Sequence, residues 1–148
     1  WGKIGLTTHV SGVLPSANGG TVLKTAESST RDGLVSEEVV VYTWPTGKKA
    51  IPVACYMHIT AQSGSITTGA QSWKTSAGNT FVNGVSNSLS NVGEIAHFGV
   101  NAINYSGAGY TSYICNAGES INFFNFSPYS GSGSISYKAS VVVIEFDA

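Results

Sequence analysis

The sequence predicts an all-β fold, an antiparallel β-sandwich formed by a single domain. Apolar residues nowhere recur at i, i+3, i+4 and i+7 over three helical turns, so no amphipathic helix is expected. β-branched and aromatic residues dominate the apolar set, and Gly, Ser and Asn separate the apolar runs, which is typical of strands joined by turns. The length of 148 residues matches one domain and suffices to bury a core.

Candidate strands are apolar runs bounded by turn residues. The stronger ones cover residues 34–44, 51–60, 94–103, 111–116, 119–126 and 134–147, and weaker ones lie near 21–25, 71–75 and 80–82. A count of eight to ten strands in a domain of this size predicts a sandwich of two sheets, with a jelly roll as its form.

Side chains alternate between the two faces of a strand, so residue parity predicts which face is buried. In residues 51–60 one face is continuously apolar and consists of Ile51, Val53, Cys55, Met57 and Ile59. The strands at 121–126 and 141–146 are apolar on both faces, with Phe124 opposite Phe123 and Val142 opposite Val143. The outer face of a sandwich normally meets water, so these strands predict a cover, most simply another copy of the chain.

Charged residues are scarce in this chain. Asp, Glu, Lys and Arg make up 10% of it and the net charge is −1, whereas soluble domains usually hold roughly 25% charged residues. The seven scattered basic residues form no patch for counterion release, which argues against a nucleic-acid partner. No apolar run approaches the roughly 18 residues that would cross a bilayer, so the chain is not expected to be embedded in a membrane.

Two cysteines, Cys55 and Cys115, lie inside apolar strand-like runs. Buried free thiols are common at such positions, so we expect free thiols. A disulfide between the two cysteines is the alternative.

No constellation of residues points to catalysis, so no catalytic residue, cofactor or metal ion is expected. Glu37 and Glu38 are neighbours on a strand and leave from opposite faces, so they cannot form the carboxylate pair of a glycosidase. Glu145 and Asp147 share a face at the chain end, where a solvated rim is expected. The chain contains neither a Gly-x-Ser-x-Gly elbow nor a phosphate-binding glycine loop.

The histidines His9, His58 and His97 are too far apart in the sequence to indicate a metal site within one subunit. If His58 or His97 faced a threefold axis, three copies could converge on an ion. A polar residue on an interface strand is the simpler interpretation.

The opening segment, LTTHVSGVLPSANGGT at residues 6–21, is typical of a connector. Pro15 stops regular structure, and the run Asn18, Gly19 and Gly20 tolerates the positive φ angles of turns and joints. The chain begins with Trp1 in place of Met, so we expect it to be a piece of a longer polypeptide.

This segment resembles the linker that precedes terminal modules in bacteriophage tail fibres and tail proteins. The matching residues are Leu6, His9, Val10, Gly12, Leu14, Pro15, Ala17, Asn18, Gly19, Gly20 and Thr21. The pattern departs at Val22, where the family usually has another Gly, so the chain is expected to enter the domain directly there. The resemblance implies a shaft-to-head linker over residues 1–24 and a β-sandwich head over residues 25–148.

The rest of the chain is similar in type to the trimeric jelly-roll heads of fibre tips, which are built like the complement C1q and tumour necrosis factor heads. The resemblance implies a homotrimeric, receptor-binding fibre tip of the virion, made in the bacterial host cytoplasm. Its partner during adsorption would be a surface glycan, such as lipopolysaccharide or capsule, or an outer-membrane protein. The alternatives are a depolymerase or esterase fragment and a purely structural trimerisation or capping module.

Four loops are the expected receptor sites, residues 62–79, 83–93, 104–110 and 127–134. Binding residues favour loops on a rigid scaffold, and low charge leaves hydrogen bonds and aromatic stacking as the forces of recognition. The expected receptor-binding residues are therefore Trp73, Tyr105, Tyr110 and Tyr129. Trp73 stands out because polar residues flank it in the longest loop, although packing within its own subunit or against a neighbour is the alternative.

Overall fold

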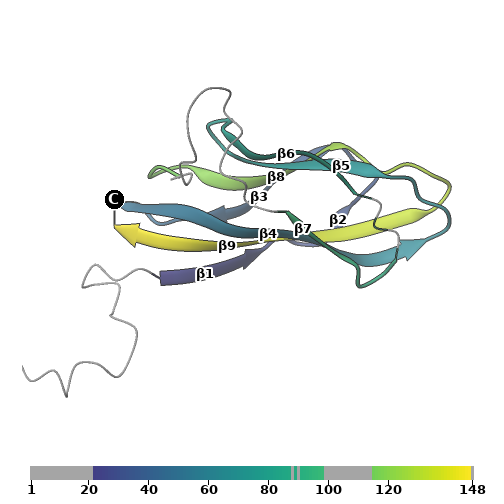
Figure 1. Cartoon of the computed structure of the whole chain (residues 1–148), viewed down its shortest axis with the longest axis horizontal. Helices are drawn as coiled ribbons and strands as arrows, with labels where there is room; N and C mark the ends of the chain where they lie inside the picture. The colour runs from purple at the N-terminus through teal and green to yellow at the C-terminus, as the bar shows by residue number, and fades with distance from the viewer. Residues whose placement is uncertain (1–21, 88, 90, 99–114, 148) are drawn as a thin grey trace, which may run out of the picture.

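The structure, a computed structural model, describes residues 22–87, 89, 91–98 and 115–147, which form two layers of antiparallel strands and no helix (Figure 1). Sheet I consists of β1 (Val22–Glu27), β2 (Arg31–Asp32), β4 (Lys48–Ser63), β7 (Ile95–Phe98) and β9 (Ser134–Asp147). Sheet II consists of β3 (Glu37–Thr43), β5 (Gly69–Thr75), β6 (Thr80–Asn87) and β8 (Ser120–Ser127). The predicted all-β fold with antiparallel sheets is confirmed.

The order of strands in each sheet brings together segments that are far apart in the sequence. Sheet I runs β1-β9-β4-β7, with β2 also paired to β9, and sheet II runs β3-β8-β5-β6. The first and last described strands are therefore neighbours, and β9 pairs with β4 along nearly its whole length. The described residues contain no helix that could span a membrane.

Most predicted strands are found. The bounds of β9 are those predicted. β4 includes the whole of its predicted segment, and β8 includes all of its predicted segment except the first residue. The three weaker segments correspond to β1, β5 and β6. The predicted strand at 111–116 is described only at its end, where Cys115 forms a bridge with Ala50. Residues 99–103 of another predicted strand lie outside the described residues.

The boundary between linker and head needs a correction. Residues 22–24 were assigned to the linker, but they belong to β1 and pair with residues 143–145 of β9. The departure from the linker pattern at Val22 coincides with the first residue of this strand. The rest of the predicted linker lies outside the described residues.

The buried face of β4 changes partway along the strand. Cys55, Met57 and Ile59 are buried as predicted, but Val53 is 47% exposed and Ile51 is half-buried. The register with β9 shifts between Pro52 and Ala54 because of a β-bulge, and a bulge moves every preceding side chain to the other face. The predicted continuous apolar face is therefore wrong for its first two residues.

The two strands predicted to be apolar on both faces, β8 and β9, have apolar side chains on both faces in the structure. In β9, Val141 and Val143 are fully buried between the sheets, while Val142 is half-buried on the outer side. In β8, Phe123 is fully buried and Phe126 is 40% exposed. These outer faces belong to different sheets and lie on opposite sides of the sandwich, so one contact cannot cover both.

Polar contacts between the layers fix how the sheets stack. The Tyr42 hydroxyl on β3 donates to Glu145 Oε2 on β9 at 2.5 Å, and the Tyr137 hydroxyl on β9 donates to Glu37 Oε1 on β3 at 3.4 Å. Each bond joins a strand of one sheet to a strand of the other. Burial of a polar group costs free energy unless it has such a partner.

Candidate functional site

Of the four predicted receptor-binding residues, the structure describes Trp73 and Tyr129, and neither lies on a surface. Trp73 and Tyr129 are buried, at 0% and 2% exposure. Tyr105 and Tyr110 lie outside the described residues. The proposed stacking of Trp73 and Tyr129 on a receptor is therefore wrong for this conformation.

Trp73 lies in β5, at the weak strand predicted near 71–75, and the wider segment 62–79 is therefore not the continuous receptor loop that was expected. Its ring packs edge-on against Phe123 and Phe98, with ring centroids 5.2 and 6.4 Å away. The inward positions on either side of it in β5 are Gln71 and Thr75, which are also fully buried. The inner face of β5 is thus largely polar, and the alternation of apolar and polar residues that marks a strand is absent from its sequence.

Gln71 can be buried because it has a partner. Its amide nitrogen donates to Asn125 Oδ1 at 3.2 Å, and the amide nitrogen of Asn125 donates to the carbonyl oxygens of Gly33 and Val35. This chain of bonds ties β5, β8 and the turn before β3 together. A satisfied amide pair can occupy an interior position that a sequence pattern assigns to an apolar residue.

Tyr129 lies in the connection between β8 and β9, which is a loop as predicted, but its ring points inward. A Cβ added to Gly69 would lie 2.9 Å from this ring, so the ring packs directly on the glycine backbone. The backbone nitrogen of Tyr129 donates to the carbonyl oxygen of Gly33 at 3.0 Å. The loops expected at 62–79 and 83–93 are also partly strand, because they contain β5 and the second half of β6.

All eight carboxylates of the chain lie among the described residues, and each has a polar partner. The pairs are Glu27 with Lys138, Asp32 with the Leu34 amide, Glu37 with Arg31, Glu38 with Lys74, Glu94 with Asn91, Glu119 with the Asn116 amide, Glu145 with Tyr42 and Asp147 with Lys48. Glu37 and Glu38 bind partners on opposite faces of β3, as predicted. Glu145 was expected on a solvated rim, but it is only 7% exposed, because its side chain points between the sheets.

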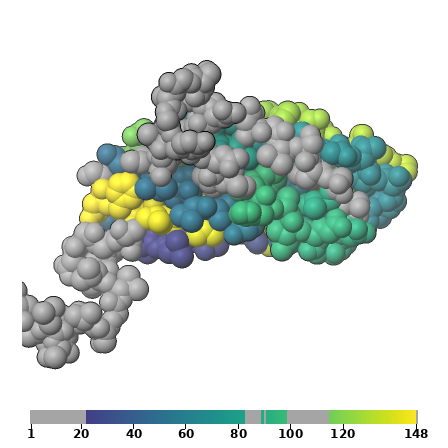
Figure 2. Space-filling view, in the orientation of Figure 1, coloured from purple at the N-terminus to yellow at the C-terminus, as the bar shows by residue number. Residues whose placement is uncertain are grey.

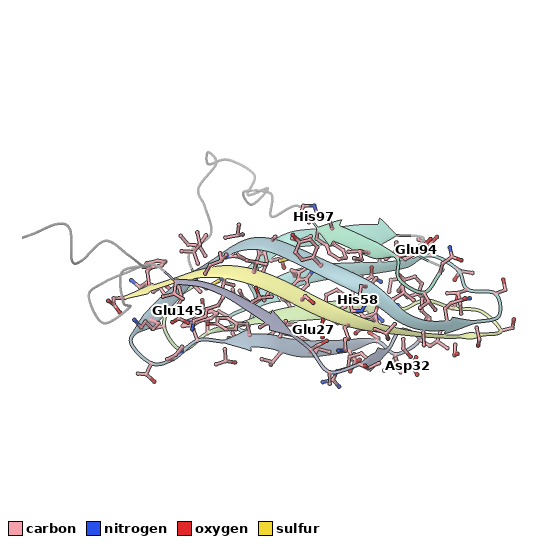
Figure 3. The ribbon with its side chains drawn as sticks, turned by 90° about the horizontal axis from the view of Figure 1, so that it is seen from below. Glu27, Asp32, His58, Glu94, His97 and Glu145 are labelled. Atoms are coloured by element: carbon pink, nitrogen blue, oxygen red, sulfur yellow. The ribbon has the colours of Figure 1, made fainter. Side chains whose placement is uncertain are left out.

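The described cysteines and histidines do not form a cluster of metal ligands. Cys55 and Cys115 are both buried and free, as expected. Tyr56 and His97 stack on the outer face of sheet I with centroids 5.1 Å apart, and His58 lies on the same face (Figure 3). Among the residues that the structure describes, no three metal-ligating side chains converge. His9 lies outside them.

Alkaline pH is expected to destabilise the fold. Burial raises the pKa of the Cys115 thiol to about 12, and burial also raises the pKa of Cys55, Tyr42, Tyr129 and Tyr137. In the unfolded chain thiols lose protons near about pH 8.5 and phenols near about pH 10. The unfolded chain then binds fewer protons than the folded one, so stability is full below about pH 8.5 and falls as the pH rises.

The melting temperature between pH 7 and 11 checks this. We expect a decline that begins near about pH 8.5 and steepens near about pH 10. A double variant, Cys55→Ala with Cys115→Ala, should move the onset toward the phenol range. A melting temperature that stays constant to pH 10.5 in both proteins would contradict the assignment of these groups to the interior.

The outer face of sheet I is an apolar surface, named here the β9 face. Leu23 on β1 is 65% exposed, Val53 on β4 47% and Ile95 on β7 62%. Between them lie half-buried residues of β9 and β4: Val142, Ile144, Phe146, Ile51 and Ala54. Figure 2 shows β1, β9 and β4 side by side at the lower edge of the molecule, in purple, yellow and blue.

Two charged residues of the β9 face, Glu27 and Lys138, are paired within the chain, and Lys49, opposite Phe146, also lies on this face. Lys138 Nζ and Glu27 Oε1 are 2.6 Å apart, and the Ser140 hydroxyl also donates to Glu27. The hydrogen bond from Lys138 lowers the pKa of Glu27 below its usual value. Apart from this pair, the middle of the face carries Thr25, Tyr56 and the two histidines among its polar side chains.

The outer face of sheet II, named here the β8 face, combines aromatic and polar side chains. Phe124 and Phe126 have ring centroids 5.9 Å apart, and Phe126 and Val40 are 40% and 58% exposed. Lys74 lies beside them and contacts Glu38 at 2.6 Å. The alternation in 121–126 located Phe124 and Phe126 on one face, but it was interpreted as a subunit contact, so the sequence reasoning missed this surface as a candidate binding site.

The comparisons with known proteins add no assignment to these two surfaces. No family model, no curated protein and no solved structure matches the chain.

Proposed function

We propose that the chain is the receptor-binding head of a bacteriophage tail fibre, that it assembles as a homotrimer of jelly-roll sandwiches, and that it acts without catalysis. The carrying observation is the β9 face, on which the large apolar side chains Leu23, Val53 and Ile95 are exposed. The resemblance of residues 6–21 to tail-fibre linkers gives the biological setting.

The β9 face has the properties of a contact between copies of one chain. Large apolar side chains are exposed across three of its strands, at Leu23, Val53 and Ile95. Exposed apolar patches of this kind mark interaction sites. Near a symmetry axis each residue meets its own copy in the neighbouring subunit, so an unpaired charge there would repel the same charge of that copy. On this face Glu27 and Lys138 form an ion pair within one chain, which reduces such repulsion.

The connectivity also supports a jelly roll. The chain crosses between the sheets repeatedly, so that β9 lies between β1 and β4 while β8 lies between β3 and β5. With the two-residue strand β2 set aside, two interleaved four-stranded sheets of this order are what the double Greek key of a jelly roll requires.

A binding role is favoured over hydrolysis by the carboxylates. A glycosidase needs two carboxyl groups that face one cleft across about 5 to 10 Å. In this chain each carboxylate is engaged with a partner in the fold, and the most buried one, Glu145, points between the sheets. A depolymerase or esterase fragment and a purely structural capping module are the competing functions.

The test uses the whole chain. Light scattering at dilute concentration should give three chains per particle, and the fluorescently labelled protein should bind some strains in a panel of bacteria. Incubation with surface polysaccharide should leave its length in a gel unchanged. A stable monomer overturns the trimer, shortened polysaccharide establishes the depolymerase, and a trimer that binds no strain establishes the structural module.

A further inference from the structure

We propose that the β8 face is a glycan-binding surface, with Phe126 as the stacking platform and Glu38 as the principal hydrogen-bond acceptor. The inference rests on the proposed receptor-binding function and assigns it a site and a ligand class. It replaces the loop aromatics Trp73 and Tyr129, which the fold buries.

The residues of the β8 face form a regular grid because they lie on three neighbouring strands. Cross-strand pairing places Val40, Asn122 and Lys74 in one row. It places Glu38, Phe124 and Ser72 in the next row, and Phe126 follows Phe124 on the same side of β8. Strands hold side chains more rigidly than loops do, which favours a preorganised site.

The two aromatic rings differ in what covers them. Lys74 Nζ lies 4.5 Å from the centroid of the Phe124 ring, so an ammonium group already occupies one face of this ring. Phe126 is 40% exposed beside it. The apolar C–H face of a sugar ring stacks on a flat aromatic side chain of this kind, and Phe126 is the open one.

A network of hydrogen bonds holds the polar group next to these rings. Glu38 accepts from Asn122 Nδ2 at 2.7 Å through Oε1 and from Lys74 Nζ at 2.6 Å through Oε2. The Ser120 hydroxyl donates to Asn122 Oδ1 at 2.8 Å, which fixes the orientation of the amide. Each carboxylate oxygen has two lone pairs, so Glu38 can still accept hydrogen bonds from a ligand.

The carboxylate of Glu38 is charged at neutral pH and remains partly open. Burial opposes its ionisation, but the hydrogen bonds from Asn122 and Lys74 outweigh burial and hold its pKa below the usual value. Its side chain is 37% exposed. Sugar hydroxyls are neutral donors, and their hydrogen bonds to a charged acceptor are stronger than those to a neutral one.

The same features argue against a protein or a second copy as the occupant. The core of a protein interface is depleted in charge and rich in contiguous apolar area, whereas the centre of the β8 face is a Lys–Glu–Asn network. The β8 face also lies on the side of the sandwich opposite the β9 face (Figure 1). If the β9 face holds the subunits together, the β8 face stays open.

Binding to immobilised lipopolysaccharides and capsular polysaccharides tests the site. We expect wild type to bind some members of the panel, and Phe126→Leu to weaken that binding about tenfold or more, because Leu is apolar but offers no flat face. Phe126→Tyr should retain binding. Glu38→Gln should weaken binding with the trimer intact, and Val92→Ala, an exposed apolar residue in the turn before β7, should change nothing.

The outcomes separate this inference from the proposed function. Normal polysaccharide binding by both Phe126→Leu and Glu38→Gln would overturn the site but leave the receptor-binding head in place. Wild type that binds bacteria but none of the polysaccharides, before and after periodate treatment of the cells, would establish a protein receptor and overturn the glycan class. Wild type that binds neither would overturn both proposals.

Discussion

Val142→Asp is expected to convert the proposed trimer into single folded chains. Val142 lies on β9 in the middle of the β9 face, paired across the sheet with Ala54 on one side and Thr25 on the other. In a single chain its side chain is half-buried on the outer surface, so a carboxylate there can remain hydrated. In the assembly the same carboxylate would be buried against another subunit, at a cost of roughly 3 to 5 kcal/mol per subunit.

Light scattering measures the number of chains per particle, and circular dichroism shows whether the strands are retained. The matched control is Val40→Asp, which places the same substitution on an exposed strand position of the other sheet. It should leave the trimer intact. Assembly of Val142→Asp at the wild-type concentration would show that the β9 face is not the subunit contact.

The strand order also separates two positions that the sequence treated alike. From the sequence, Phe124 and Val142 were both expected to lie under another copy of the chain. The strand order places these residues on opposite outer faces of the sandwich, so the two positions report on different surfaces. Alternation within a strand shows that both of its faces are apolar, but it does not show which sheet the strand joins.

A strand could be predicted where the apolar residues of its own sequence formed a clear pattern. The bounds of β9 followed from its long apolar run after the Gly/Ser segment at 130–133, and its buried positions alternate without interruption in the structure. β4 has an equally clear alternation, but the bulge at residues 52–54 changes its faces, and nothing in the apolar pattern marks that position. A bulge is decided by pairing with β9, which is distant in the sequence.

The candidate site was harder to predict because burial of polar residues depends on partners from other strands. Gln71 can be buried because Asn125 of β8 accepts its hydrogen bond. β5 can therefore point a polar side chain into the core. A sequence that surrounds Trp73 with polar residues therefore looks like an exposed loop. Conversely, Phe126 is open because it lies near the end of β8, beyond the ring that Lys74 covers.

Trp73→Ala is expected to lower the free energy of unfolding by about 3 to 5 kcal/mol, since it removes a large, fully buried side chain and leaves a cavity. Trp73 contacts Phe98 of sheet I and Phe123 of sheet II, so the cavity would lie between the two layers. Denaturant unfolding at a fixed protomer concentration measures the loss, because dissociation contributes to the stability of an oligomer.

The matched control is Phe126→Ala, which truncates an aromatic residue that is 40% exposed and should cost much less stability. The two variants are therefore expected to show opposite phenotypes. Trp73→Ala should lose stability, and its folded fraction should still bind polysaccharide, because the indole ring does not reach the surface. Phe126→Ala should keep its midpoint of unfolding nearly unchanged and lose polysaccharide binding. If Trp73→Ala instead abolished binding at unchanged stability, the ring would have to leave the core to meet the receptor, and the assignment of the site to the β8 face would fail.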